Sequence, residues 1–198
     1  KGLYSSLLDR NYHEIAHTLN RQIGQQGLYR GIDLYNFVDN HDVDRVASKL
    51  GDPALLYPLY LLLFTMPGIP SIYYGSEWGL KGVKGAYSDA TLRAYLELDG
   101  ISNGAPNPDL PKAISSLAVI RRKSKALRMG AYRALDVRAQ QLAFTRETDN
   151  DKVLVLLNSA PDRVNLELEL PWKNQWVQNL LEPGEVHHIK GGKLTMEV

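Results

Sequence analysis

The sequence predicts an α/β region followed by an all-β region, with the boundary between residues 128 and 129. Up to Arg128, apolar residues at helical spacing alternate with two short apolar runs, as in the βα units of a parallel sheet or barrel. After Arg128 the apolar spacing changes to two and turn signals separate short runs, as in an antiparallel β-sandwich. We therefore expect domains at residues 1–128 and 129–198.

The first βα unit occupies the start of the chain. Residues 1 to about 24 read as a loop and then a helix, which Asn11 or Asp9 can begin and Gly24 ends. Residues 32–38 read as a strand that runs into polar residues at its C-terminal end. In βα barrels the reactive groups gather at such strand ends.

The second unit repeats this plan. Asp52 can cap its helix, and Pro53 suits the first turn. This helix is apolar nearly all round, so we expect it to be covered on both sides. Residues 69–75 then read as a short buried strand. An irregular stretch at 79–110 follows, of a length that is usually functional, and then a helix at 111–125.

The all-β region contains seven runs with the two-residue period or strand-like composition. We expect strands near residues 131–138, 141–147, 153–158, 164–170, 176–180, 186–190 and 194–198.

Composition excludes several classes of protein. The 198 residues are 44% hydrophobic and 23% charged with a net charge of +1, which gives no reason to expect nucleic acid or a membrane as partner. Cysteine is absent, so disulfides and thiolate metal sites are excluded. This fits the bacterial cytoplasm, which we favour over secretion without excluding either.

Asn40, His41 and Asp42 follow the first predicted strand. Asp and neutral His can accept and donate hydrogen bonds to a polyol, and a carboxylate favours developing positive charge on a sugar ring. A polar turn is the simpler interpretation of three such residues, so their context decides.

The sequence around these three residues resembles that of the α-amylase family of glycoside hydrolases. Residues 37–45, FVDNHDVDR, resemble the family's fourth conserved region at the end of barrel strand seven. Residues 67–77, PGIPSIYYGSE, resemble the stretch that ends strand eight. The final β part resembles the small sandwich after the barrel. The resemblance covers essentially the whole chain and implies terminal βα units of a (β/α)8 TIM barrel followed by a small antiparallel β-sandwich.

The resemblance also implies roles. Asp42 matches the third catalytic carboxylate, which stabilises the transition state, and His41, with Asn40 beside it, matches the histidine that contacts sugar hydroxyls. Arg45 and Glu77 match structural positions near the site. Residue 76 is Ser where many members have Asp, which puts a calcium or substrate role there in doubt.

Aromatic residues near the second strand extend the predicted site. Tyr74 and Trp78 could stack on sugar faces, with Trp78 at the rim, and at least one of Tyr73 and Tyr74 should be core. Arg93 should anchor the long loop through a salt bridge. Further on, we expect Trp172 and Trp176 in the core or at a sheet edge. A starch-binding role for them stays open, without support from the sequence.

The implied function is a retaining hydrolase of α-glucans, similar to α-amylase, cyclomaltodextrinase or neopullulanase, acting on starch or maltodextrin. The family's nucleophilic Asp and acid/base Glu end strands four and five, and no segment here resembles them. We therefore expect a C-terminal fragment, inactive alone, that self-associates or pairs with the missing N-terminal part. No cofactor is evident, and the longer protein could hold calcium. The alternative is a non-catalytic, amylase-like binding or structural subunit.

A zinc metalloprotease is a further alternative. His13, Glu14 and His17 fit the H-E-x-x-H pattern, which puts two histidines on one helix face. A catalytic zinc site needs a third protein ligand, and none follows at a suitable spacing; His187 and His188 lie in the β region. We expect a surface helix here and no metal site.

Overall fold

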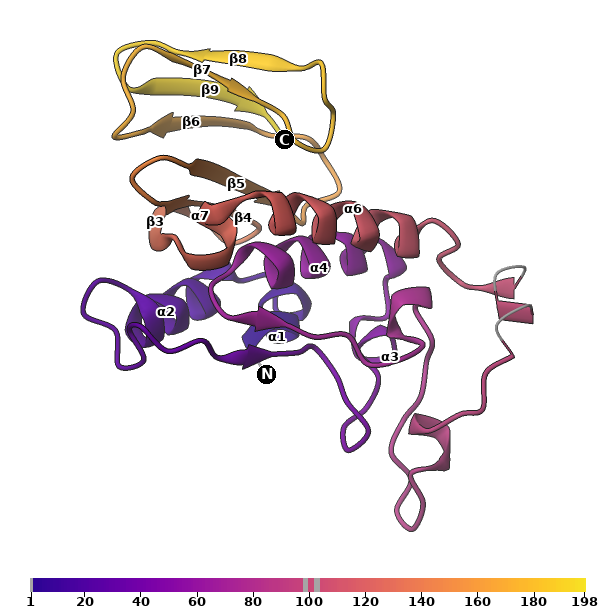
Figure 1. Ribbon diagram of the computed structural model, residues 1–198. Coiled ribbons are helices and arrows are strands. Elements are labelled where there is room, and N and C mark those ends of the chain that lie inside the picture. Colours follow the sequence, from indigo (N-terminus) through magenta and orange to yellow (C-terminus); the bar gives the residue numbers. More distant parts are fainter. Residues whose placement is uncertain (1, 98–99, 102–103) are drawn as a thin grey trace.

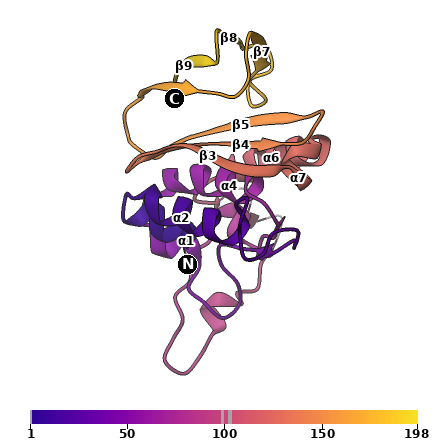
Figure 2. The same cartoon turned by 90° about the vertical axis from the view of Figure 1, so that its left-hand side faces the viewer.

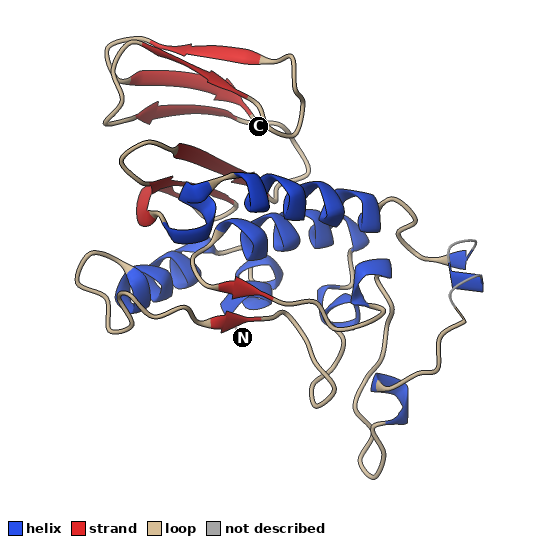
Figure 3. Cartoon of the chain, in the orientation of Figure 1, coloured by secondary structure: helices blue, strands red, loops and turns tan. Residues whose placement is uncertain are grey.

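A computed structural model describes residues 2–97, 100–101 and 104–198. Its first region is mainly helical and contains two very short strands (Figures 1 and 3). The helices are α1 (Gly2–Leu8), α2 (Tyr12–Ile23), α3 (Val46–Leu50), α4 (Leu56–Thr65), α6 (Leu110–Lys123) and α7 (Lys125–Met129). The strands are β1 (Tyr35–Asn36) and β2 (Ile69–Pro70), and 3-10 turns occur at η1 (Pro53–Leu55), η2 (Ser76–Trp78) and η3 (Ala90–Leu92).

The second region is all-β, and each of the seven predicted strands is present. They are β3 (Ala131–Val137), β4 (Gln141–Glu147), β5 (Lys152–Asn158), β6 (Asn165–Glu169), β7 (Gln175–Gln178), β8 (Val186–Ile189) and β9 (Lys193–Glu197). Strands β3, β4 and β5 form one antiparallel sheet, while β6 pairs with β9 and β7 pairs with β8.

These sheets form two layers, as Figure 2 shows, with β3–β5 between the helices and the outer pairs. Between the layers, Ala143 of β4 packs with Leu166 and Leu168 of β6. A second small core contains Trp172 and Ile189. The layers therefore have the arrangement of a β-sandwich, while the other side of the β3–β5 sheet, with Leu142 and Phe144, packs against the helices.

The N-terminal helix α2 confirms the predicted start and stop. The Asn11 side chain accepts a hydrogen bond from the N–H of His13, and Gly24 ends the helix. The prediction of a loop before this helix is wrong, because residues 2–8 form α1. Leu3 and Leu7 of α1 are buried in the main core, so tertiary packing stabilises a helix of only seven residues.

Strands β1 and β2 are parallel, as expected of βα units, but much shorter than the predicted 32–38 and 69–75. Tyr35 is paired with Ile69, and the ladder is continued only by the bonds Ile69 N–H to Leu34 O (2.7 Å) and Ser71 N–H to Asn36 O (2.8 Å). Tyr35 is 65% exposed and Ile69 is 52% exposed, so the burial predicted for the second strand is wrong. Within the described residues each strand has one neighbour, which limits the ladder.

Helix α4 lies in the middle of the main core. Asp52 Oδ1 accepts a hydrogen bond from the N–H of Ala54 at 2.9 Å, so the predicted cap is present, but on the 3-10 turn η1 that leads into α4. Leu59, Tyr60 and Leu62 are fully buried. In Figure 1, α4 and α6 lie side by side under the sandwich.

Two buried arginines close the C-terminal end of α4. Arg121 of α6 donates to the carbonyl of Phe64 at 2.8 Å, and Arg146 of β4 donates to that of Thr65 at 2.7 Å. Arg146 also donates twice to the carbonyl of Gly130. Desolvation by burial, and then the charge of Arg121, lowers the pKa of Arg146. These bonds satisfy carbonyls that the end of a helix leaves unpaired.

The main core extends across the predicted domain boundary. It contains Leu59 and Ile114 from the helical region together with Leu142 and Phe144 from β4. The division at residues 128 and 129 stays a prediction. No helix among the described residues is long and apolar enough to cross a membrane.

Candidate functional site

The loop after β1 is fixed by the buried carboxylate of Asp39, which is 1% exposed. Asp39 Oδ2 accepts a hydrogen bond from the N–H of Val46, the first residue of α3, at 2.8 Å. The Ser76 hydroxyl donates to the same carboxylate at 2.8 and 2.9 Å. Asp39 thus caps α3 and ties the loop after β1 to the loop after β2.

Arg45 completes this connection and is also 1% exposed. Its guanidinium donates to the carbonyl of Tyr74 at 2.5 Å, to the Ser76 hydroxyl at 3.1 Å and to the carbonyl of Leu92 at 2.7 Å. It also lies over the ring of Tyr73, 4.2 Å from its centroid. Three chain segments therefore converge on one buried cation.

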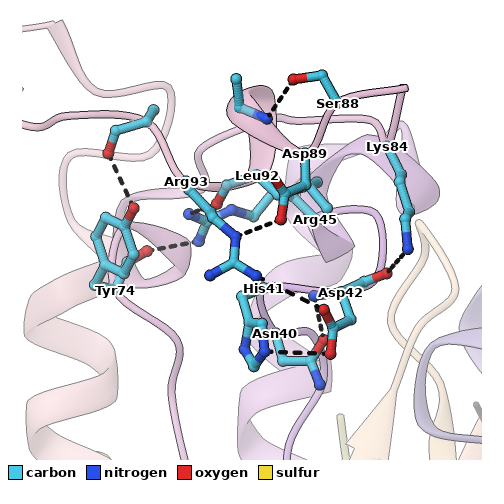
Figure 4. A network of polar contacts seen from close by, with 12 residues as sticks. Asn40, His41, Asp42, Arg45, Tyr74, Lys84, Ser88, Asp89, Leu92 and Arg93 are labelled. Carbon is cyan, nitrogen blue, oxygen red and sulfur yellow. Dashed lines mark hydrogen bonds and ion pairs between the residues drawn. The ribbon is translucent and has the colours of Figure 1, made fainter. Parts of the chain in front are cut away.

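Asp42 belongs to the same loop as Asp39 and Arg45 but lies at the protein surface, with its side chain 61% exposed. Figure 4 shows three cationic or ring groups around it. His41 Nε2 lies 3.2 Å from Asp42 Oδ2, Arg93 Nη2 lies 3.8 Å from Oδ1, and Lys84 Nζ donates to the Asp42 carbonyl at 3.2 Å. The carboxylate is therefore oriented by its neighbours while remaining open to solvent on its other sides.

Asn40 forms a turn, as in the polar-turn interpretation of residues 40–42. Its Oδ1 accepts a hydrogen bond from the N–H of Asp42 at 2.9 Å, as in an Asx turn. This bond fixes the backbone that carries Asp42 and leaves the Asn40 amide nitrogen for other partners.

The loop after β2 brings the aromatic residues of the predicted site beside Asp42. The ring of Tyr73 lies 4.7 Å from that of Tyr74 and 6.3 Å from that of His41. Tyr73 is half-buried and Tyr74 is 43% exposed, so the prediction that one of them is core is wrong. The segment that precedes these tyrosines is only partly covered, since Ile69 is 52% exposed and Ile72 packs half-buried against the main core.

An open pocket of about 510 Å³ adjoins these residues. Its lining contains two predicted substrate contacts, Tyr74 and Trp78, and two of the three residues predicted to be structural, Glu77 and Arg93, together with Gly75, Ala94, Tyr95 and Leu96. One carboxylate oxygen of Glu77, Oε2, is buried without a hydrogen-bond partner among the described residues. Arg93 joins the two parts of the site, since it lines the pocket and faces Asp42.

The long loop is held against the site by one ion pair and by hydrogen bonds. The salt bridge of Arg93 with Asp89, at 2.5 Å from Nε to Oδ2, lies within the loop, while its 3.8 Å pair with Asp42 links the loop to the site. At the other end of the loop, Asp44 accepts from the Lys84 N–H at 2.7 Å and from Lys49 Nζ at 2.9 Å. No short-range pattern pointed to Lys84, because its partners lie some forty residues earlier in the chain.

The pKa values of three acidic residues near the site are shifted, and the shift of Asp39 is opposite to those of Asp44 and Asp89. Burial raises the pKa of Asp39, although the hydrogen bonds from Val46 and Ser76 and the charge of Arg45 oppose that shift. The N–H of Lys84 and the Lys49 ammonium lower the pKa of Asp44, and Arg93 lowers that of Asp89. Relative to a free carboxyl, these pKa shifts favour proton binding at Asp39 and proton release at Asp44 and Asp89.

The H-E-x-x-H residues form no metal centre in the part of the chain that the structure describes. His13, Glu14 and His17 lie exposed on α2, where Tyr12, Ile15 and Leu19 form the buried face. Over residues 2–97, 100–101 and 104–198, no three His, Cys, Asp or Glu side chains are arranged to hold a metal ion.

Two family models match the chain. The model described as "Alpha amylase, catalytic domain" matches residues 9–146, and that described as "Maltogenic Amylase, C-terminal domain" matches residues 132–198. The two matches overlap on β3 and β4, the strands that pack against the helices.

Individual proteins agree with these models. A cyclomaltodextrinase of Geobacillus thermopakistaniensis is 26% identical over 89% of this chain, and neopullulanase 2 of Thermoactinomyces vulgaris is 28% identical over 82%. The aligned parts cover 28% and 27% of those relatives, so the chain spans little more than a quarter of their length. Among solved structures, an Anoxybacillus α-amylase superposes with a TM-score of 0.84 at 20% identity, over 99% of this chain and 42% of that one.

Proposed function

The chain belongs to the α-amylase family, and we propose that it is part of a retaining glycoside hydrolase that cleaves α-glucosidic bonds in starch, maltodextrin or cyclodextrin. The nucleophile and the general acid/base would come from outside these 198 residues. The relatives named cyclomaltodextrinase and neopullulanase support this class of substrate.

Within that protein, β1 and β2 would be strands seven and eight of the catalytic TIM barrel. Their parallel pairing supports this assignment, as does the position of the site on the loops that follow both strands. Strands β3–β9 would form the sandwich domain that follows the barrel.

Asp42 would stabilise the transition state. Retaining hydrolysis passes through an oxocarbenium-like state in which positive charge develops on the sugar ring. A fixed carboxylate beside the ring lowers the energy of that charge, and it needs no reorganisation because Asn40, His41 and Arg93 already orient it. The exposed side of Asp42 leaves room for the sugar.

The surrounding side chains would bind the substrate. His41 and the Asn40 amide can hydrogen-bond to hydroxyls, while Tyr74 and Trp78, on the wall of the open pocket, can stack on the apolar faces of neighbouring sugar rings. Arg45 and Glu77 would support the loops rather than touch the sugar.

The observation that carries the proposal is the exposed, oriented carboxylate of Asp42 in the loop that follows a parallel strand. Its test is maltodextrin hydrolysis by the full-length protein with Asp42→Asn. The amide removes the negative charge with little change in shape, so we expect turnover to fall by at least about 1,000-fold.

Asp44→Asn is the matched control, because Asp44 lies two residues away and its carboxylate bonds to Lys49 and Lys84. It should leave activity within a few-fold. Near-normal turnover of the Asp42 variant would remove the assigned role. An inactive wild type would favour the non-catalytic, amylase-like subunit instead.

We further propose that the exposed edges of β1 and β2 pair with strands of another segment or copy. Tyr35, Phe37 and Ile69 expose 65, 40 and 52% of their surface there, and open strand edges promote association. Sedimentation of the 198-residue chain should reveal self-association, or pairing with a separately produced N-terminal part. A strictly monomeric chain that binds no such part would contradict this.

In the described part of the chain, no three His, Cys, Asp or Glu side chains are grouped to hold a metal ion. Calcium in the longer protein stays a prediction. A cytoplasmic location in a bacterium stays a prediction.

A further inference from the structure

The outer face of the β7–β8 hairpin presents a large aromatic residue to solvent. Trp176 of β7 is 70% exposed, whereas Trp172, four residues earlier, is 3% exposed in the core. Trp176 is directly paired with His188 of β8, and the two rings lie 4.7 Å apart at an interplanar angle of 38°. The neighbouring ring therefore restricts the orientation of the exposed indole.

The strand register defines which side chains share this face. Val177 and Ile189 point to the sandwich core, and Ile189 is fully buried. The opposite face carries Trp176 and Gln178 from β7 and their direct partners His188 and Val186 from β8. We predicted Trp176 in the core or at a sheet edge. The structure places it outside the core, on the solvent-facing side of a two-stranded sheet.

Hairpin stability alone does not require tryptophan at this position. A cross-strand pair contributes about 0.2–1 kcal/mol, and smaller β-branched or aromatic side chains supply that as well. A fixed, exposed indole carries an additional property, an apolar ring surface that a ligand can cover.

The chemistry of the face suits a neutral ring-shaped polyol. The indole supplies a flat apolar surface, while the Gln178 amide and the His188 imidazole provide donors and acceptors at its edge. These four residues include no Asp, Glu, Lys or Arg, so the face offers no charge to recognise an ionic ligand.

The size of the face also favours a sugar over a protein. A stable protein interface needs about 800 Å² and some 20–30 residues on each side. The hairpin has two strands of four residues each, and half of those face inward. One or two sugar rings match a surface of this size.

We propose that Trp176, with Gln178 and His188, forms an accessory binding platform for α-glucan chains. The choice of glucan rests on the proposed function; the platform itself rests on the geometry of the hairpin. Figures 1 and 2 show β7 and β8 at the end of the molecule opposite to the loop of residues 79–97, which packs against Asp42. The platform would therefore hold a polymer away from the catalytic loops.

The experiment is titration of the 198-residue chain with maltoheptaose and with β-cyclodextrin, followed by calorimetry and by the three indole N–H signals in NMR. We expect a dissociation constant on the order of 1 mM, because one aromatic platform gives few contacts. Trp176→Ala should weaken binding about 10-fold or more, and the indole signal that this variant lacks should be the one that shifts in the wild type.

Two variants locate the binding. Tyr87→Ala removes a fully exposed aromatic of the long loop and should leave the affinity unchanged. His41→Ala removes sugar contacts only at the Asp42 end, so binding at the platform should survive it. Cellohexaose, with β-linkages, should bind more weakly than maltoheptaose.

Three results would overturn the proposal. They are absence of glucan binding by the wild-type chain, unchanged affinity in Trp176→Ala, and a change in self-association on sedimentation of Trp176→Ala without loss of sugar binding. The last would place a second copy of the chain on the face. None of them depends on turnover by the full-length protein, so the platform and the proposed hydrolase can fail separately.

Discussion

Two sheets of this chain come from similarly apolar sequences and differ greatly in extent. The β1–β2 sheet contains two residues in each strand, although apolar runs of seven residues predicted both strands. The β3–β5 sheet contains seven residues in each strand, close to prediction. Phe144 in the centre of β4 is fully buried, while Phe37 just after β1 is 40% exposed.

The difference shows that neighbours, rather than composition, set the length of a strand. Strand β4 is paired on both edges, with β3 and β5, and contacts helices through Leu142 and Phe144. Strand β1 has one partner on the described chain. An apolar run without partners on its free edge gains few ladder hydrogen bonds, so it stays short.

Replacing the two phenylalanines should give the largest contrast. Phe144→Ala leaves a cavity in the main core and should lower the free energy of unfolding by about 3–5 kcal/mol. Phe37→Ala, on the poorly covered sheet, should cost less than about 1 kcal/mol. Urea unfolding at one protein concentration measures both, and equal losses would mean that β1 is as well packed as β4.

Arg146→Met should have the next largest effect, because it breaks the connection between the sandwich and the end of α4. The carbonyls of Thr65 and Gly130 would lose a charged donor inside the core, at a cost of about 2–3 kcal/mol. Arg138→Met is the control, since Arg138 is 43% exposed and pairs with Asp136 at the surface. If both variants unfold at the same urea concentration, the buried contacts of Arg146 are not needed to hold the two regions together.

Asp39→Asn tests the buried hydrogen bonds that tie the loop after β1 to the loop after β2. The amide supplies one acceptor where two are used, by Val46 and by Ser76, so we expect a loss of about 1–2 kcal/mol at neutral pH.

The pH dependence of that loss has a definite sign. Because burial raises the pKa of Asp39, the folded state holds this proton more tightly than the unfolded state. Protonated Asp39 stabilises the fold below its unfolded pKa of about 4, and this contribution is lost as pH rises through the folded value. The stability difference between wild type and Asp39→Asn should therefore grow as pH falls toward 4, and a difference that shrinks would contradict the raised pKa.

Asp42→Asn should have the smallest effect on stability, within about 0.5 kcal/mol, because its side chain is 61% exposed. Asp39 and Asp42 lie three residues apart, and thermal unfolding of the two asparagine variants compares them directly. A loss at Asp42 as large as that at Asp39 would make Asp42 structural. Unchanged stability of Asp42→Asn would support its proposed role in catalysis, since the same substitution is expected to abolish most activity of the full-length protein.

Local sequence predicted much of this protein. Asn11 marked the start of α2, and Asp52 marked the 3-10 turn that leads into α4. The two-residue period predicted the seven strands from β3 to β9, because capping and alternation depend on neighbouring residues. The motif at residues 37–45 indicated the family, which the match over residues 9–146 shows.

Tertiary structure decided what local pattern could not. Helix α3 is capped by Asp39 seven residues upstream, and Ser76 and Lys84 reach the loop of residues 39–44 from about forty residues away. These contacts exist only after the chain has folded, so no short window contains them. The same holds for β1 and for Trp176. Local sequence predicted both strands, but the neighbours of β1 decided its length, and the register of β7 and β8 decided that Trp176 faces water.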